Sequence, residues 1–150
     1  MNIMMRVEKP KQREWSQNLL DKAIEFHGHG GPFMVVGLRM GLTALKLLKA
    51  RGWFDMNCSL DLPFNPPYSC VIDGVQVATG CTMGKRNIEI RDREGISGEF
   101  TTDKGRIRLS LKSKFLKRIK ETLALSDEGA TQVLMEEIIE ANDRSLFEIF

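Results

Sequence analysis

The sequence predicts an α+β fold in which helices pack on a small antiparallel sheet within a single domain, residues 1–150. Apolar residues recur at helical spacing in the first and last thirds of the chain. The middle third holds prolines, glycines and short alternating runs, which are typical of strands and turns. Helices and strands do not alternate regularly enough for a doubly wound parallel sheet. Residues 1–9 are polar and are expected to be a flexible N-terminus.

Two helices are expected to flank a glycine-rich segment. The first should run from about Pro10 to Glu25 and end where glycines follow. The second should begin at Pro32, a residue favoured in the first helical turn, and end near Arg51. Its apolar surface is wider than one stripe, so we expect it to be buried on most sides.

The chain after the second helix is expected to be extended. Cys58–Leu62 and Tyr68–Ile72 are candidate strands, because prolines between them exclude a helix. Asp73 is a candidate N-cap for a short helix from Gly74 to about Cys81.

Residues 87–111 should form two or three strands, because apolar and charged residues alternate there. Asp103-Lys104-Gly105 is a plausible hairpin turn. Amphipathic helices are expected after it, followed by an apolar tail that ends at Phe150 and could pack into a partner subunit.

Composition favours an ordinary globular protein of the cytoplasm. The net charge is +2, so no nucleic-acid partner is implied. No run approaches the ~20 apolar residues of a membrane span, and no signal peptide is visible. The three cysteines form no CxxC pair, which favours a reducing compartment.

Both histidines of the chain lie in Phe26-His27-Gly28-His29. Residues two apart point the same way on an extended segment, and the glycines favour such a backbone. Two imidazoles could then bind one metal ion or one anionic ligand. The alternative is a pair of surface loop histidines.

A second polar segment surrounds Cys81. A thiolate is both a metal ligand and a nucleophile. Lys85 close by would lower the pKa of this thiol, whereas a helix C-terminus would raise it. Cys81 could instead be a buried small apolar residue, and packing is the expected role of Cys58 and Cys70.

The two segments together resemble the FmdE family, which is named for a component of formylmethanofuran dehydrogenase. The resemblance spans residues 15–145 and includes a Phe-His-Gly-His element, a Gly-x-Arg helix, an Asp-x-x-Gln pair and a Thr-Gly-Cys-Thr-x-Gly-Lys element. The matching residues are Phe26, His27, Gly28, His29, Pro32, Gly37, Arg39, Asp73, Gln76, Thr79, Gly80, Cys81, Thr82, Gly84 and Lys85. The family's cysteine after the histidines is replaced by Gly31, and this chain has no zinc-ribbon domain with CxxC pairs.

The resemblance implies an α+β fold, an intertwined homodimer and a metal site built from the histidine and cysteine motifs. The expected metal ligands are His27, His29 and Cys81, with Cys81 and Lys85 as catalytic residues. A divalent metal ion, zinc before iron or nickel, suits these donors. Residues expected to bind a cofactor or an acidic or amide-bearing small substrate are Arg39, Asp73, Gln76 and Thr79.

Three functions stay open on this basis. The protein could be a metal-dependent or redox-linked enzyme, with a metal that activates water or a carbonyl group. It could be a non-catalytic subunit that binds a small molecule or cofactor for a larger redox assembly. Thiol chemistry at Cys81 alone is the third.

Overall fold

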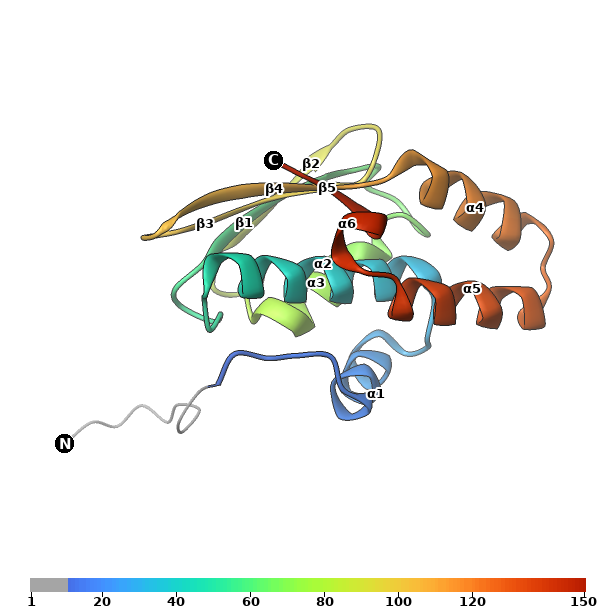
Figure 1. Cartoon of the computed structure of the whole chain (residues 1–150), viewed down its shortest axis with the longest axis horizontal. Coiled ribbons are helices and arrows are strands. Elements are labelled where there is room, and N and C mark those ends of the chain that lie inside the picture. Colours follow the sequence, from blue (N-terminus) through green and yellow to red (C-terminus); the bar gives the residue numbers. More distant parts are fainter. Residues whose placement is uncertain (1–10) are drawn as a thin grey trace.

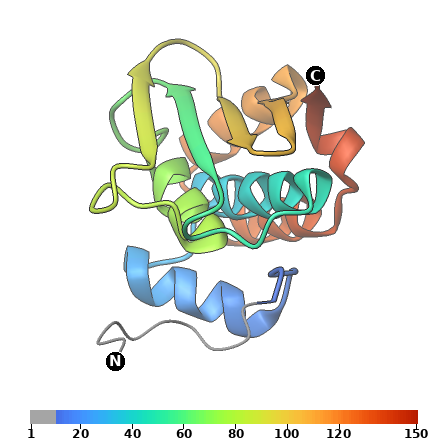
Figure 2. The ribbon, with the colours of Figure 1, turned by 90° about the vertical axis from the view of Figure 1, so that its left-hand side faces the viewer.

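The computed structural model describes residues 11–150 and shows one sheet covered by helices on one face (Figure 1). Helices α2 and α3 lie against the sheet, and α1 packs on the side of these helices that faces away from it (Figures 1 and 2). The expected α+β fold is therefore confirmed. The elements are α1 (Gln17–His27), α2 (Pro32–Leu48), β1 (Asn57–Leu62), α3 (Cys70–Thr79), β2 (Ile88–Asp92), β3 (Ser97–Thr102), β4 (Gly105–Leu111), α4 (Ser113–Ala124), α5 (Glu128–Glu140), α6 (Asp143–Leu146) and β5 (Phe147–Ile149).

The sheet has five strands in the order β2-β1-β3-β4-β5. All neighbours are antiparallel except β1 and β2, which are parallel. The sheet is thus mixed rather than purely antiparallel, because α3 connects β1 to β2 and parallel neighbours require such a crossover. The hairpin between β3 and β4 turns at Asp103 and Lys104, as expected.

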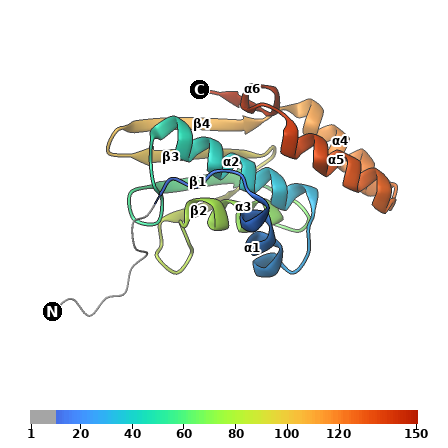
Figure 3. The ribbon, with the colours of Figure 1, turned by 60° about the horizontal axis from the view of Figure 1, so that its bottom comes forward.

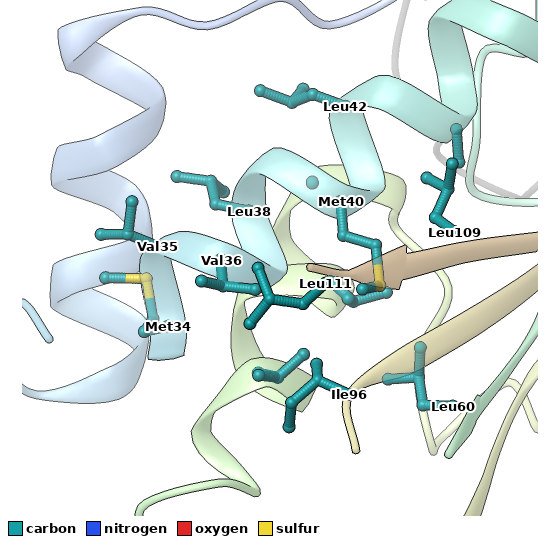
Figure 4. Packing of buried hydrophobic residues seen from close by; sticks show 14 of the residues in the cluster. Met34, Val35, Val36, Leu38, Met40, Leu42, Leu60, Ile96, Leu109 and Leu111 are labelled. Atoms are coloured by element: carbon teal, nitrogen blue, oxygen red, sulfur yellow. The ribbon is translucent and has the colours of Figure 1, made fainter. Parts of the chain in front are cut away.

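The core lies between the sheet and α2. Met40 extends from α2 toward the strands that carry Leu60 and Leu109 (Figure 4). A Cβ atom added to Gly98 of β3 would lie 2.9 Å from the sulfur of Met40, so the glycine makes room for this side chain. Helix α2 is buried along most of its length, as its wide apolar surface predicts.

Helices α2 and α3 touch backbone to backbone. A Cβ atom on Gly37 would lie 2.0 Å from the carbonyl oxygen of Val71, and one on Gly74 would lie 2.1 Å from that of Met34. Any side chain at either position would force the helices apart. This contact brings the beginning of α2 and the segment before it close to the beginning of α3.

Three expected element boundaries were wrong. Helix α1 begins after its N-cap Ser16, whose hydroxyl accepts a hydrogen bond from the Leu19 N–H; Pro10 lies outside the described residues. The segment expected as a strand over Tyr68–Ile72 turns into α3 at Cys70. Asp73 is therefore in the first turn of α3 and is not its N-cap.

Helices α4 and α5 lie side by side beyond one end of the sheet (Figure 3). The chain then returns through α6 to add β5 to the edge of the sheet. Phe147 is buried there, and Phe150 is 70% exposed. Since α3, α5 and the sheet cover α2 within one protomer, the apolar surface of α2 no longer argues for a dimer.

The expected flexible segment 1–9 lies outside the described residues. Over residues 11–150, none of the helices combines the length and the apolar character that crossing a membrane requires.

Candidate functional site

The site forms where the end of α1 meets the beginning of α3. Helix α1 ends at His27 because Gly28 adopts a left-handed conformation, with φ of 101°. The side chain of Asp73 projects from the first turn of α3. Nδ1 of His27 and Oδ2 of Asp73 are 2.5 Å apart, a close charge-assisted contact.

The contact with Asp73 sets the chemistry of the imidazole. A carboxylate accepts a hydrogen bond from Nδ1–H, which leaves a lone pair on Nε2 of His27. The His27 side chain is 10% exposed, and Nε2 is buried with no hydrogen-bond partner in residues 11–150. A buried nitrogen with a free lone pair can bind a metal ion or accept a proton.

The ring of His29 lies beside that of His27, with ring centroids 4.7 Å apart and planes tilted by 42°. The extended segment therefore brings the two imidazoles together, as the sequence predicts. Unlike His27, His29 is exposed to solvent.

Two cavities border His27. The smaller has a volume of about 80 Å³ and lies between the histidine segment, α2 and α4. The larger has a volume of about 360 Å³ and lies between α3 and β2. The smaller is lined by His27, His29, Gly31, Pro32, Phe33, Met34, Pro67, Cys70 and Leu123. The larger is lined by His27, Phe64, Pro66, Ser69, Cys70, Ile72, Asp73, Gln76, Met83 and Ile90.

Cys70, expected only to pack, borders both cavities. It is the first residue of α3 and precedes Asp73 by three positions, which places both on one face of the helix. Burial, and then the charge of Asp73, raises the pKa of the Cys70 thiol. The Cys-x-x-Asp spacing could have indicated this residue, but the mistaken strand over Tyr68–Ile72 concealed it.

Gly31 stands where the resembling sequences have a cysteine. A Cβ atom at Gly31 would lie 3.1 Å from Cε1 of His29, so a cysteine there would contact the imidazole. In this chain Cys70 is the cysteine that borders the cavity of the two histidines.

Cys81 lies at the other end of α3, beyond the C-terminal cap Gly80. It is fully buried, and its Sγ lies 3.3 Å from the carbonyl oxygen of Met56, to which it donates a hydrogen bond. A hydrogen bond from the Cys58 thiol lowers the pKa of Cys81 to about 7, although burial opposes the shift. Cys58, which shares this contact, has its pKa raised.

Cys81 and the histidines therefore do not share a centre within the protomer. Across residues 11–150, no three His, Cys, Asp or Glu side chains are arranged so that they could hold a metal ion.

Three other predicted site residues make contacts away from His27. Arg39 donates hydrogen bonds to the carbonyl oxygens of Ile138 and Ile139 and to Asp143, so it connects α2 to α5 and α6. The ammonium group of Lys85 bonds to the carbonyl oxygen of Gly80 and to the hydroxyl of Thr82.

Thr79 is buried and completes the local structure around Cys81. Its hydroxyl donates to the carbonyl oxygen of Val75 and accepts from the Cys81 N–H. Of the residues expected to bind a cofactor or substrate, Asp73 and Gln76 line the larger cavity beside His27.

The fold and the site define a small α+β domain with a polar pocket built around a histidine–carboxylate pair. The sequence profile of a family described as "FmdE, Molybdenum formylmethanofuran dehydrogenase operon" matches residues 26–148. The chain belongs to the FmdE family.

A crystal structure and a curated relative are similar to this chain. The crystal structure is of an FmdE-like protein of tungsten formylmethanofuran dehydrogenase type from Syntrophus aciditrophicus, with a TM-score of 0.62 at 20% identity over 89% of this chain and 70% of that one. At this identity the match shows the fold alone. The relative is a probable S-adenosyl-L-methionine-binding protein of Archaeoglobus fulgidus, 41% identical over 71 residues. That alignment covers 47% of this chain and 19% of the relative, so the chain matches about a fifth of the relative's length.

Proposed function

We propose that the protein binds a divalent metal ion, zinc first among the candidates, in the cavity shared by His27, His29 and Cys70. Nε2 of His27 would be the central ligand, and Asp73 would orient the ring. Cys70 takes the place that the sequence assigned to Cys81. The observation that carries the proposal is the buried Nε2 of His27 without a hydrogen-bond partner in residues 11–150.

A buried polar atom without a partner costs about 1–3 kcal/mol, so such an atom beside a cavity indicates a missing ligand. Metal-binding histidines commonly donate their other ring N–H to a carboxylate, and the Asp73–His27 contact has this form. The nitrogen and sulfur donors around the cavity suit zinc.

Binding requires the donors to move closer, since no three such groups converge in the described part of the chain. His29 can supply part of this movement, because it is exposed and lies between Gly28 and Gly30. The ion would polarise a carbonyl group or activate water when bound. The chain's own residues would fix the His27 ring through Asp73 and hold the substrate in the larger cavity.

Metal analysis of the purified protein, followed by calorimetric titration of the metal-free protein with zinc, tests this proposal. We expect about one ion per protomer, lost in His27→Ala and weakened in Cys70→Ser. Cys81→Ser is the matched thiol control and should bind zinc like the unchanged protein. Absence of zinc binding, or binding that depends on Cys81 and not on Cys70, would overturn the proposal.

A non-catalytic role in a larger redox assembly is the second candidate, and the larger cavity favours it as a small-molecule site. A protein that binds a small molecule without any metal would support this role. A homodimer remains a prediction, supported now only by exposed apolar side chains such as Phe150 and Leu47. Sedimentation velocity at micromolar concentration tests it, and a monomer would contradict it.

A further inference from the structure

We propose that the larger cavity binds a flat, uncharged molecule whose apolar body carries a hydrogen-bond donor beside an acceptor, as a primary aryl carboxamide does. This inference deepens the proposed function by naming the ligand class of the same site. It rests on the unpaired polar atoms, the charge and the apolar walls of the cavity.

Asp73 and Gln76 form the polar edge of the cavity. Oε1 of Gln76 accepts a hydrogen bond from the Met83 N–H at 3.0 Å, which fixes the orientation of the amide. The NH₂ group of Gln76 therefore points elsewhere, and residues 11–150 supply no acceptor for it. Oδ2 of Asp73 is occupied by His27, whereas Oδ1 has no hydrogen-bond partner in the same part of the chain.

The two free groups complement each other. Asp73 and Gln76 are three residues apart on α3, so their side chains are neighbours on one helix face. They offer one acceptor and one donor side by side. A primary carboxamide presents the reverse pair, an N–H donor beside a carbonyl acceptor, and can satisfy both.

The charge of the cavity selects against acids. None of its lining residues is a lysine or arginine, and Asp73 contributes a carboxylate. A carboxylate or phosphate ligand would be repelled by Asp73 without a compensating cation. Arg39 and Lys85, which were expected to orient an acidic substrate, make their contacts elsewhere. Of the acidic and amide-bearing substrates expected from the sequence, the structure favours the amide.

The walls of the cavity are apolar and partly uncovered. Phe64 is 57% exposed and Met83 is 56% exposed, and Ile72 and Ile90 complete the apolar lining. A flat apolar body would remove this surface from water, which contributes about 25 cal/mol per Å². The volume of about 360 Å³ lies within the range of small-molecule sites.

Benzamide and benzoate are matched probes, because they have nearly the same shape and differ in charge and in the N–H donor. We would titrate each into the full-length, EDTA-treated protein and follow backbone amide shifts by NMR. Benzamide should bind saturably and shift the amides of residues 73, 76 and 83. Benzoate should bind at least tenfold more weakly.

Variants locate the contacts. Gln76→Glu keeps the acceptor for the Met83 N–H and removes the donor, so it should weaken benzamide binding at least tenfold. Phe64→Ala should also weaken binding, whereas Phe150→Ala, which removes an exposed phenylalanine elsewhere, should not.

Equal binding of both probes, no saturable binding of benzamide, or unchanged benzamide binding in Gln76→Glu would overturn the inference. Because the titration uses metal-free protein, such a result leaves the zinc measurement unaffected. Loss of zinc binding alone would overturn only the proposed metal site.

Discussion

The carboxylate of Asp73 contacts Nδ1 of His27 at 2.5 Å across 46 residues of sequence. The contact joins the end of α1 to the first turn of α3, and it leaves Nε2 as the reactive side of the imidazole. It therefore defines the site more closely than either histidine motif alone.

Asp73→Asn should weaken zinc binding without unfolding the protein. The amide cannot supply the negative charge that orients and polarises the ring, and loss of such a partner typically costs about 10–100-fold in metal affinity. Calorimetric titration measures the change. Asp103→Asn, in the exposed hairpin turn, is the matched control and should bind zinc normally. Equal affinities in both variants would contradict a role for the Asp73–His27 contact.

The reactivities of the thiols should rank opposite to their pKa values. Cys81 has a pKa of about 7 but is fully buried, whereas the pKa of half-buried Cys70 is raised. Access to the reagent should dominate, so iodoacetamide should modify Cys70 first in the folded, metal-free protein. Peptide mass spectrometry identifies the modified residue. Zinc should protect Cys70, and rapid modification of Cys81 would instead revive thiol chemistry at that position.

Arg39 should prove to be a structural residue. Arg39→Met leaves the carbonyl oxygens at the end of α5 and the carboxylate of Asp143 without their buried donor, and should lower the free energy of unfolding by about 3–5 kcal/mol. Arg106→Met, at an exposed arginine, should change it by less than about 0.5 kcal/mol. Urea unfolding measures both. Normal stability with lost ligand binding in Arg39→Met would restore the cofactor-binding role.

Asp61 should make stability depend on pH in the acid range. It is buried on the sheet, and burial raises its pKa, but hydrogen bonds from Arg108 and Arg91 outweigh burial and lower it overall. A lowered folded-state pKa stabilises the protein above the unfolded value of about 3.9, and this stabilisation is lost as the pH falls through the folded value.

Asp61→Asn tests this sign. It should be less stable than the unchanged protein at pH 7, by about 1–3 kcal/mol, and the difference should shrink at about pH 3. Urea unfolding at the two pH values measures it. A difference that is the same at both values would contradict the assignment.

The sequence predicted the overall fold better than the site. The helical periodicity of α2, the alternation in β4 and the turn at Asp103 depend on local patterns, and the structure confirms them. The parallel pairing of β1 with β2 was missed because the segment before Asp73 was interpreted as a strand. Its apolar residues at 71, 72, 75 and 78 have helical spacing, which would have corrected the error.

The site was only half predictable for the same reason. Adjacent histidines on a glycine-rich segment must lie together, so their pairing could be inferred locally. Which cysteine approaches them depends on the direction and start of α3. Once α3 begins at Cys70, that thiol lies at the end of the helix near His27, and Cys81 lies at the far end.

Cobalt(II) titration followed by absorption spectroscopy tests the central claim most directly, because a thiolate ligand gives a charge-transfer band in the near ultraviolet. We expect a saturable signal at about one ion per protomer, with the thiolate band lost in Cys70→Ser and kept in Cys81→Ser, and the whole signal lost in His27→Ala. A thiolate band that disappears in Cys81→Ser and persists in Cys70→Ser, or a signal that survives His27→Ala, would contradict the account.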